Sequence, residues 1–252
     1  YQRNFIRSCY DAINGFESNS LEDAKKNNEK SKMRNVGFTI ETKPDYCQQK
    51  HVDMMLDYGI TRVEIGVQSL TERVYNIVNR GHDLQQVISS FQIAKDAGYK
   101  IVAHMMPGLP TMSPKEDIAD FKKLFEMDEF KPDMLKIYPA LVLKDTPLYD
   151  DYKLGNYKPY STEEMITVLS EAKKSIPKWV RVMRIQREIT MDEIVDGPKM
   201  GNLRQKIHQE LERQGTSCKC IRCREAGLNN KKEFPELRLE RIDYNACGGK
   251  EV

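Results

Sequence analysis

The sequence contains no long hydrophobic run. No apolar segment approaches the roughly 20 residues that a membrane-spanning helix needs. Residues 1–20 carry polar side chains throughout, without the apolar stretch and small-residue cleavage site of a signal peptide. Internal repeats and low-complexity tracts are also absent. These absences argue against a membrane-spanning or secreted protein and predict a cytoplasmic one.

An excess of charge of either sign is missing as well. The 252 residues include 40 basic and 38 acidic side chains, a net charge of +2, so any affinity for nucleic acid must come from local clusters of Lys and Arg. Hydrophobic residues make up 39% and charged residues 31%, as in a globular protein with a well-solvated surface. A chain of this length predicts one large domain or two modest ones.

Neither end of the chain resembles the natural end of a domain. The sequence opens within a helix-like stretch, without a start methionine, and closes on a strand-like run, residues 238–244, that leads into a glycine turn. We therefore expect this chain to be part of a longer protein.

Two kinds of sequence pattern alternate from residue 35 onward. Helical patterns lie between short runs of β-branched residues, and two of them end at Gly59 and Gly98, which are typical helix-terminating glycines. Ser161 with Glu164 predicts a capping box at the start of the last helix. Strands that alternate with helices predict βα units and a parallel sheet. The expected strands are residues 36–42, 62–68, 100–106, 134–138 and 180–185, and the expected helices are residues 48–58, 72–78, 83–97, 114–126 and 162–175.

Polar residues interrupt the predicted strands. Parallel strands are usually apolar on both faces, but these carry Glu41, Glu64, Gln68, His104 and Lys136. Such side chains are costly to bury unless they pair or line a cavity. A closed or partly open (β/α) barrel offers that cavity, with ligand groups at the carboxyl ends of its strands. We predict an α/β fold, with a partial (β/α) barrel over residues 1–190 and a small metal-binding linker subdomain over residues 191–252.

Three cysteines lie within six positions, at Cys218, Cys220 and Cys223. Thiolates at this spacing on one short loop can occupy adjacent corners of a tetrahedron, so the cluster predicts a metal site, with zinc as the first choice. A closed structural site needs a fourth ligand, for which Cys47 and His208 are the candidates. Cys47 is preferred because a thiolate from the barrel would tie the linker subdomain to it.

Nine motifs, in order along the chain, resemble the catalytic subunit of Elongator and its single-chain archaeal and bacterial relatives. One motif alone would be weak, but nine in order are not a chance match. They are FTIETKPDYC, VEIGVQSL, VNRGH, AHMMPGLP, LKIYPALV, RIQREI, GNLRQK, CKCIRCREAG and RIDYNACGGKEV.

The resemblance implies a radical-SAM barrel joined to an acetyl-CoA-binding acetyltransferase domain, which together modify the wobble uridine of tRNA at carbon 5. It implies a 4Fe–4S cluster that cleaves S-adenosylmethionine, tRNA and acetyl-CoA as partners, and a homodimer or further Elongator subunits. The family's cluster-binding cysteines lie upstream of Tyr1, and its acetyltransferase domain begins near the end of this chain. The chain alone is therefore expected to perform neither cofactor cleavage nor acetyl transfer.

Four residues become candidates for binding S-adenosylmethionine through the same resemblance. Glu41 lies on the strand that holds the cofactor's ribose in such barrels, although a carboxylate here can also pair with a neighbouring cation, Lys43 or Arg62. Gln68 offers both a donor and an acceptor to the cofactor. Arg80 suits the methionine carboxylate as a bidentate partner, or is a solvated cation at a helix end.

His104 is the fourth candidate. A single histidine on an apolar strand is usually a core residue that is hydrogen-bonded internally, but His104 precedes MMPGLP, where related barrels contact the adenosine.

Substrate contacts are expected from two other strands. Lys136 and Tyr138 alternate with apolar residues, so both should face the same side and, if that side is the lumen, hold an acyl group or the edge of a uracil. Arg184 and Arg187 lie in a basic run whose guanidinium groups suit phosphate and base contacts. Solvated surface arginines are the commoner case, and the resemblance to a tRNA enzyme favours the functional interpretation.

Two other functions remain open. A radical-SAM enzyme of the coproporphyrinogen-oxidase-like kind shares the GVQS and GLP motifs, but the linker subdomain and its cysteine cluster argue against it. The third hypothesis is a non-catalytic tRNA-binding module, because the basic strands are present whereas the cluster motif is not.

Overall fold

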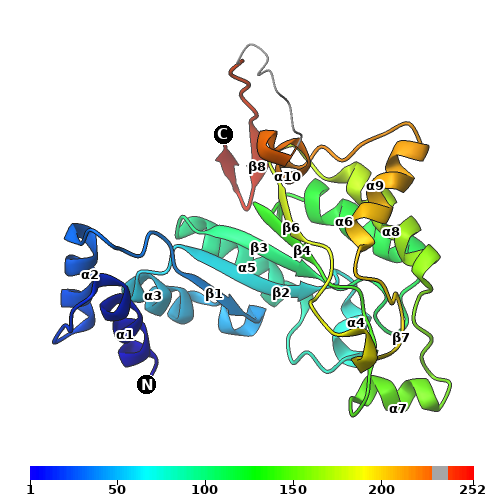
Figure 1. Cartoon of the computed structure of the whole chain (residues 1–252), viewed down its shortest axis with the longest axis horizontal. Coiled ribbons are helices and arrows are strands. Elements are labelled where there is room, and N and C mark those ends of the chain that lie inside the picture. The colour runs from blue at the N-terminus through cyan, green and yellow to red at the C-terminus, as the bar shows by residue number, and fades with distance from the viewer. Residues whose placement is uncertain (229–237) are drawn as a thin grey trace.

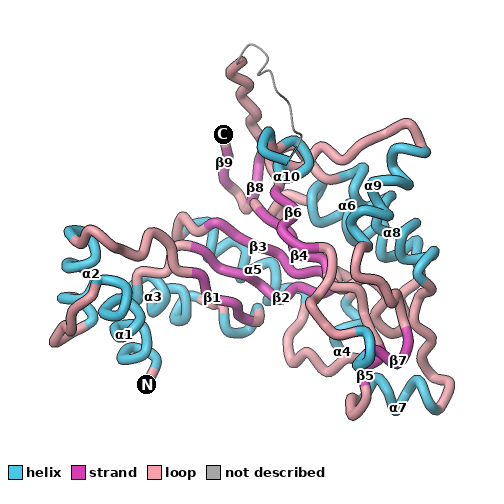
Figure 2. Tube along the Cα trace, in the orientation of Figure 1, coloured by secondary structure: helices cyan, strands magenta, loops and turns pink. Residues whose placement is uncertain are grey.

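A parallel five-stranded sheet forms the centre of the molecule. The computed structural model describes residues 1–228 and 238–252. The strands lie in the order in which they occur along the chain, each parallel to its neighbours, as in a (β/α) barrel. In Figure 2 they run side by side through the middle of the molecule. The strands are β1 (Thr39–Thr42), β2 (Arg62–Gln68), β3 (Lys100–Met105), β4 (Met134–Ile137) and β6 (Arg181–Arg184), which confirms the predicted α/β fold.

Helices connect successive strands, and their ends follow the predicted capping signals. Ser161 and Glu164 form the expected capping box, and Gly59 ends its helix with φ 77°, a left-handed conformation that favours glycine. The helices over residues 114–126 and 162–175 have the predicted bounds, and both begin at a capping box. The connecting helices are α3 (Gln49–Tyr58), α4 (Glu72–Ile77), α5 (Leu84–Asp96), α6 (Pro114–Glu126) and α8 (Thr162–Ser175).

The two faces of the sheet differ in polarity because side chains alternate along each strand. One face, here called the apolar face, carries Val63, Ile65, Ile101 and Leu135, all with no exposed surface, and packs in one core with side chains of α3, α5, α6 and α8. The opposite face, here called the polar face, carries the charged residues of the same strands. The helices therefore stabilise the sheet from one side and leave the other for ligands.

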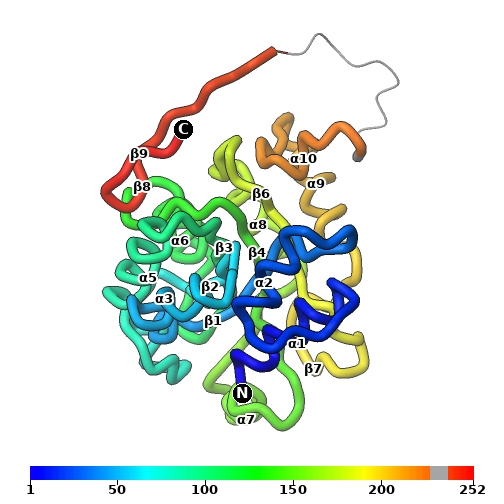
Figure 3. Tube along the Cα trace, turned by 90° about the vertical axis from the view of Figure 1, so that its left-hand side faces the viewer, coloured from blue at the N-terminus to red at the C-terminus, as the bar shows by residue number. Residues whose placement is uncertain are grey.

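The first two helices form a small unit of their own. α1 (Gln2–Asn14) and α2 (Leu21–Lys30) pack through Ile6, Tyr10, Leu21 and Ala24 in a separate hydrophobic cluster. They lie at the end of the molecule beyond β1, which faces the viewer in Figure 3.

The segment after β6 shares the core of the barrel. Leu203, Ile207 and Leu211 of α9 (Leu203–Arg213) belong to the same hydrophobic cluster as the strands. β7 (Ile194–Asp196) pairs with β5 (Val142–Leu143) in a two-stranded antiparallel sheet. The division at residue 190 stays a prediction, and no break in the core marks it. The remaining elements are α7 (Pro147–Lys153), α10 (Ile221–Arg224), β8 (Tyr244–Ala246), β9 (Gly249–Glu251) and short 3-10 turns at Pro44–Tyr46, Met191–Glu193 and Ala226–Leu228.

One predicted strand is largely wrong. Residues 238–243 are not in a strand, and β8 begins only at Tyr244. Glu240 pairs instead with Lys178 and Arg241 with Asp243, whereas Tyr244 stacks on Trp179 with ring centroids 4.0 Å apart. The hairpin of β8 and β9 stands beside the sheet near the C-terminus in Figure 1. Among the described residues, no helix is long and apolar enough to cross a bilayer.

Candidate functional site

A buried ion network occupies the polar face of the sheet. His104 Nε2 from β3 lies 2.7 Å from a Glu64 carboxylate oxygen of β2, and the Lys136 ammonium of β4 donates to the same oxygen. Lys136 is in register with His104, so both side chains leave neighbouring strands on one face. Glu64, His104 and Lys136 therefore form one connected group, here called the lumen network.

The charges of this network compensate one another. Burial acts to raise the pKa of Glu64, but hydrogen bonds from His104 and Lys136 outweigh it and lower that pKa to about 2. The Glu64 side chain is only 6% exposed, so water contributes little to its solvation. A carboxylate that is ionised at neutral pH fixes the Lys136 ammonium and the histidine ring in place.

Glu41 lies at the edge of the lumen network. Its carboxylate is 3.5 Å from His104 Nδ1, and its side chain is 61% exposed. The alternative partners do not engage it, since Lys43 pairs with Asp45 at 3.1 Å and Arg62 donates to Thr39. An exposed carboxylate beside a buried network is available to a ligand.

A second group of polar side chains lies at the carboxyl end of β2. Arg80 Nη2 donates to the Gly66 carbonyl at 3.0 Å. A Cβ on Gly66 would lie 3.0 Å from Gln68 Nε2 and 3.1 Å from Arg80 Nη2, so both side chains converge over this glycine. Gln68 ends the strand with φ 71°, and its backbone carbonyl accepts from the Met106 N–H at 2.7 Å.

Two buried atoms of this group have no hydrogen-bond partner within the described chain, Gln68 Oε1 and Arg80 Nε. Buried polar atoms without partners are costly, and one donor beside one acceptor suits a ligand that offers both. Burial lowers the pKa of Arg80, which is not the solvated helix-end cation of the alternative interpretation.

Tyr138 joins the lumen network through its ring. It meets His104 edge-on with ring centroids 5.4 Å apart, which agrees with the expected placement of Lys136 and Tyr138 on one side. The Arg187 guanidinium lies 5.2 Å from the centroid of the Tyr138 ring, a cation–π distance. Arg184 does not join them, since its half-exposed side chain lies 3.9 Å from Glu188.

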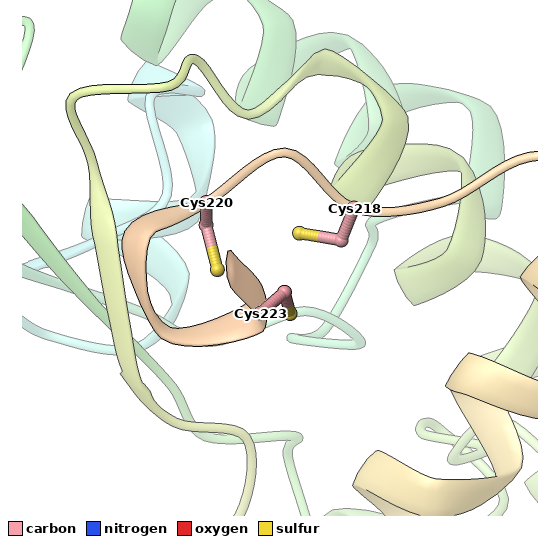
Figure 4. A group of neighbouring side chains, drawn as sticks. All are labelled: Cys218, Cys220 and Cys223. Carbon is pink, nitrogen blue, oxygen red and sulfur yellow. The ribbon is translucent and has the colours of Figure 1, made fainter. Parts of the chain in front are cut away.

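The three clustered cysteines form a separate candidate metal centre. The sulfur atoms of Cys218, Cys220 and Cys223 all lie within 4.8 Å of one another, and their side chains point into one shared space in Figure 4. Hydrogen bonds from the other two thiols lower the pKa of Cys220. The Ile221 N–H donates to the Val180 carbonyl at 2.9 Å, so this loop lies beside the start of β6. The metal centre is therefore at the opposite end of the sheet from Gln68 and Arg80.

His208 approaches this centre, and Cys47 does not. His208 Nε2 is 3.5 Å from Cys223 Sγ, and burial together with the cations of Lys173 and Arg204 lowers its pKa to about 4, so the imidazole is neutral. Cys47 is not a member of the sulfur cluster, and it is completely buried in the core, where burial raises the pKa of its thiol to about 12. This corrects the sequence-based preference for Cys47 as the fourth ligand, because that side chain packs against the core.

Two residues of these sites were not chosen from the sequence. Glu64 was recognised only as a polar strand residue, although its place two residues before Gly66 in VEIGVQ puts it on the polar face with His104. Lys173 has no exposed surface, and its ammonium lies 3.1 Å from His208 Nε2 and 3.6 Å from Cys223 Sγ. No local signal marks a buried lysine near the end of a charged helix.

A parallel sheet with polar side chains gathered on one face is the arrangement of a partial (β/α) barrel, and comparison with known proteins identifies the family. Residues 16–124 match the Radical SAM superfamily, and residues 132–213 match the Radical_SAM C-terminal domain. The chain thus belongs to the radical SAM superfamily.

More particularly, the chain is 46% identical over its whole length to the tRNA uridine(34) acetyltransferase of Methanocaldococcus jannaschii and 43% identical to Elongator complex protein 3 of Saccharomyces cerevisiae. It covers 48% and 46% of those two proteins, so it spans about half the length of the curated relatives that it matches. A solved structure, the archaeal Methanocaldococcus infernus Elp3 with an N-terminal deletion (1-46), superposes with a TM-score of 0.95 at 47% identity, covering 99% of this chain and 60% of that one. The chain corresponds to the radical-SAM part of the Elongator-type tRNA uridine acetyltransferases, which confirms the resemblance seen in the motifs.

Proposed function

We propose that this chain binds S-adenosylmethionine on the polar face of its sheet and presents it to a tRNA wobble uridine within a complete acetyltransferase. The observation that carries the proposal is the pair of polar groups on this face, the lumen network and the convergence of Gln68 and Arg80 over Gly66. Two archaeal relatives that match the whole chain are named tRNA uridine(34) acetyltransferase, which supplies the substrate class.

The two polar groups suit different parts of the cofactor. Arg80 and Gln68 would hold its amino-acid end, because a guanidinium complements a carboxylate and the amide offers a donor and an acceptor. Glu41 would accept the ribose hydroxyls, and His104, which is 2% exposed, would position the Glu41 carboxylate from within the lumen network. A 4Fe–4S cluster, expected from the family, would supply the electron for reductive cleavage of the sulfonium.

The three clustered cysteines do not fit that iron–sulfur cluster. A cluster that cleaves the cofactor must contact it, whereas the cysteine loop lies beside Val180 at the opposite end of the sheet. We infer that Cys218, Cys220 and Cys223 hold zinc, with His208 as the fourth ligand, and that the metal fixes this loop. The buried Lys173 offsets the negative charge of the thiolates. Neutral imidazole and thiolates are typical structural zinc ligands.

The lumen network has a role in presenting the substrate. Glu64 holds the Lys136 ammonium in one position, beside the exposed end of the site, where it can donate to the carbonyl of an acyl group or a uracil. Arg187, held over the ring of the buried Tyr138, provides a cation for RNA, and Arg184 adds an exposed cation. The tRNA, acetyl-CoA, any further Elongator subunits and the cytoplasmic location belong to the complete protein and stay predictions.

The first experiment measures the affinity of the complete protein for S-adenosylmethionine by isothermal titration calorimetry. Arg80→Ala and Gln68→Ala should each raise the dissociation constant about tenfold, the loss of one charge-assisted or one buried hydrogen bond. Lys50→Ala, a change to an exposed lysine on α3, is the control and should leave it unchanged. Unchanged affinity in both site variants would show that the cofactor binds elsewhere.

A further inference from the structure

Helix α6 carries two buried carboxylates that face the sheet. Asp117 is 4% exposed and Asp120 is 2% exposed, and they stand three residues apart, so they lie on one side of the helix. Neither is a candidate ligand residue. Carboxylates are rarely buried without a reason, and the partners of these two give one.

Asp120 holds the loop that follows β2. Its carboxylate accepts hydrogen bonds from Ser69 Oγ at 2.7 Å, from the Leu70 N–H at 2.8 Å and from Thr71 Oγ1 at 3.2 Å. These three residues directly follow Gln68, so Asp120 fixes the backbone on which that side chain is mounted.

Asp117 holds the loop that follows β3. One of its oxygens accepts from the Gly108 N–H and from the Tyr160 hydroxyl, each at 2.8 Å. The Tyr157 hydroxyl donates to the carbonyl of the same Gly108 at 2.7 Å. Gly108 has φ 84°, a conformation that favours glycine, and both of its backbone polar groups are therefore held by side chains from other elements.

Ionisation of the buried Asp117 carboxyl at neutral pH costs stability. Burial raises its pKa to about 6, because no cation pairs with it among the described residues. A folded-state pKa above the unfolded value means that stability is lost as pH rises through 6, so ionised Asp117 lowers the stability of the fold at neutral pH. A residue that costs stability and organises a loop is typical of a functional site.

We propose that Asp117 and Asp120 are positioning residues that join the loops after β2 and β3 to one rigid helix, and so set the cofactor site of the proposed function. The two loops are also joined to each other, since the Met106 N–H donates to the Gln68 carbonyl. α6 thus acts as a brace at the carboxyl ends of two strands. Both aspartates would act through these loops, without contacting the cofactor themselves.

The test compares cofactor affinity with thermal stability in the complete protein. Asp120→Ala and Asp117→Ala should each raise the dissociation constant for S-adenosylmethionine by about tenfold, as expected when a charge-assisted hydrogen bond that fixes a binding loop is lost. Asp117→Asn should keep wild-type affinity, because both donors bind one oxygen that an amide also provides, and it should raise the melting temperature by removing the buried charge.

Asp133→Ala is the matched control. Asp133 is another buried carboxylate, 8% exposed, that accepts from the Ile101 N–H at 2.9 Å and pairs with Lys95 and Lys100, but it lies at the amino end of the strands. Its loss should lower the melting temperature and leave the dissociation constant within about twofold of wild type.

The measurements distinguish failure of the proposed cofactor binding from failure of the brace. If the wild-type protein does not bind the cofactor, the proposed function is wrong. If the wild type binds it and Asp117→Ala and Asp120→Ala bind it equally well, or if Asp133→Ala weakens binding as much as they do, the brace is wrong and these aspartates only stabilise the fold.

Discussion

Replacing Glu64 by glutamine tests whether the lumen network is held by charge. The glutamine has nearly the same shape but leaves the buried Lys136 ammonium without a counter-charge. The interval between an ordinary glutamate pKa of 4.5 and the folded-state pKa of about 2 corresponds to roughly 3 kcal/mol. Loss of one partner of a buried ion pair typically costs about 3–5 kcal/mol, which agrees. For a domain of this size, the melting temperature should fall by roughly 6–12 °C.

The destabilisation caused by Glu64→Gln should become smaller at low pH, whereas destabilisation caused by a packing defect should not depend on pH. Because the folded-state pKa of Glu64 is depressed, its contribution is complete above pH 4.5 and is lost as pH falls toward 2. By pH 3.5 the wild-type protein should have lost roughly 1 kcal/mol of the stabilisation that ionised Glu64 provides. The difference in melting temperature between wild type and Glu64→Gln should therefore shrink between pH 7 and pH 3.5, as measured by circular dichroism.

Glu41→Gln is the matched control in the same experiment. Its carboxylate also faces His104, but the side chain is 61% exposed, so water screens the interaction and the melting temperature should change by less than about 2 °C. A Glu64→Gln protein as stable as wild type, or one whose deficit is the same at both pH values, would refute the charge-based account of the network.

Three further predictions concern the metal centre and the basic residues near the lumen network. His208→Ala should change the visible absorption spectrum of the cobalt-substituted protein, because one nitrogen ligand is lost, and an unchanged spectrum would remove His208 from the ligand set. Lys173→Met should weaken zinc retention against a chelator by about 10–100-fold, the range for residues that contact metal ligands, and equal retention would make Lys173 a packing residue only. Arg187→Ala and Arg184→Ala should each make the slope of log tRNA affinity against log salt concentration shallower by about one. An unchanged slope would show that the RNA binds elsewhere.

The elements whose signals are local were predicted well. α6 and α8 begin at capping boxes and have the expected bounds, since their caps are encoded within a few residues. β2 has the predicted bounds because it is apolar on one face and polar on the other. The order of strands along the sheet also followed, because each βα unit places its strand beside the previous one.

The contacts between distant parts of the chain could not be predicted in the same way. The choice between Cys47 and His208 depended on how α9 packs against α8, and no short-range pattern encodes that packing. Lys173 stands on a helix with Lys174 beside it, and only the fold shows that the first is buried and the second pairs with Glu171 at the surface. Burial of one charged residue among several is a tertiary property.

Replacing Gly66 tests whether this glycine is needed for the conformation of the backbone or for the placement of the Gln68 and Arg80 side chains. No positive φ requires glycine there, so alanine should be tolerated by the backbone and should slightly reduce the entropy of the unfolded chain. The added methyl group would, however, lie 3.0 Å from Gln68 Nε2 and 3.1 Å from Arg80 Nη2. Both are the ends of flexible side chains, so they would move aside and leave their positions over the strand. Gly66→Ala should therefore melt within about 2 °C of wild type while its dissociation constant for S-adenosylmethionine rises about tenfold. If affinity were retained at unchanged stability, the convergence of the two side chains over Gly66 would have no part in holding the cofactor.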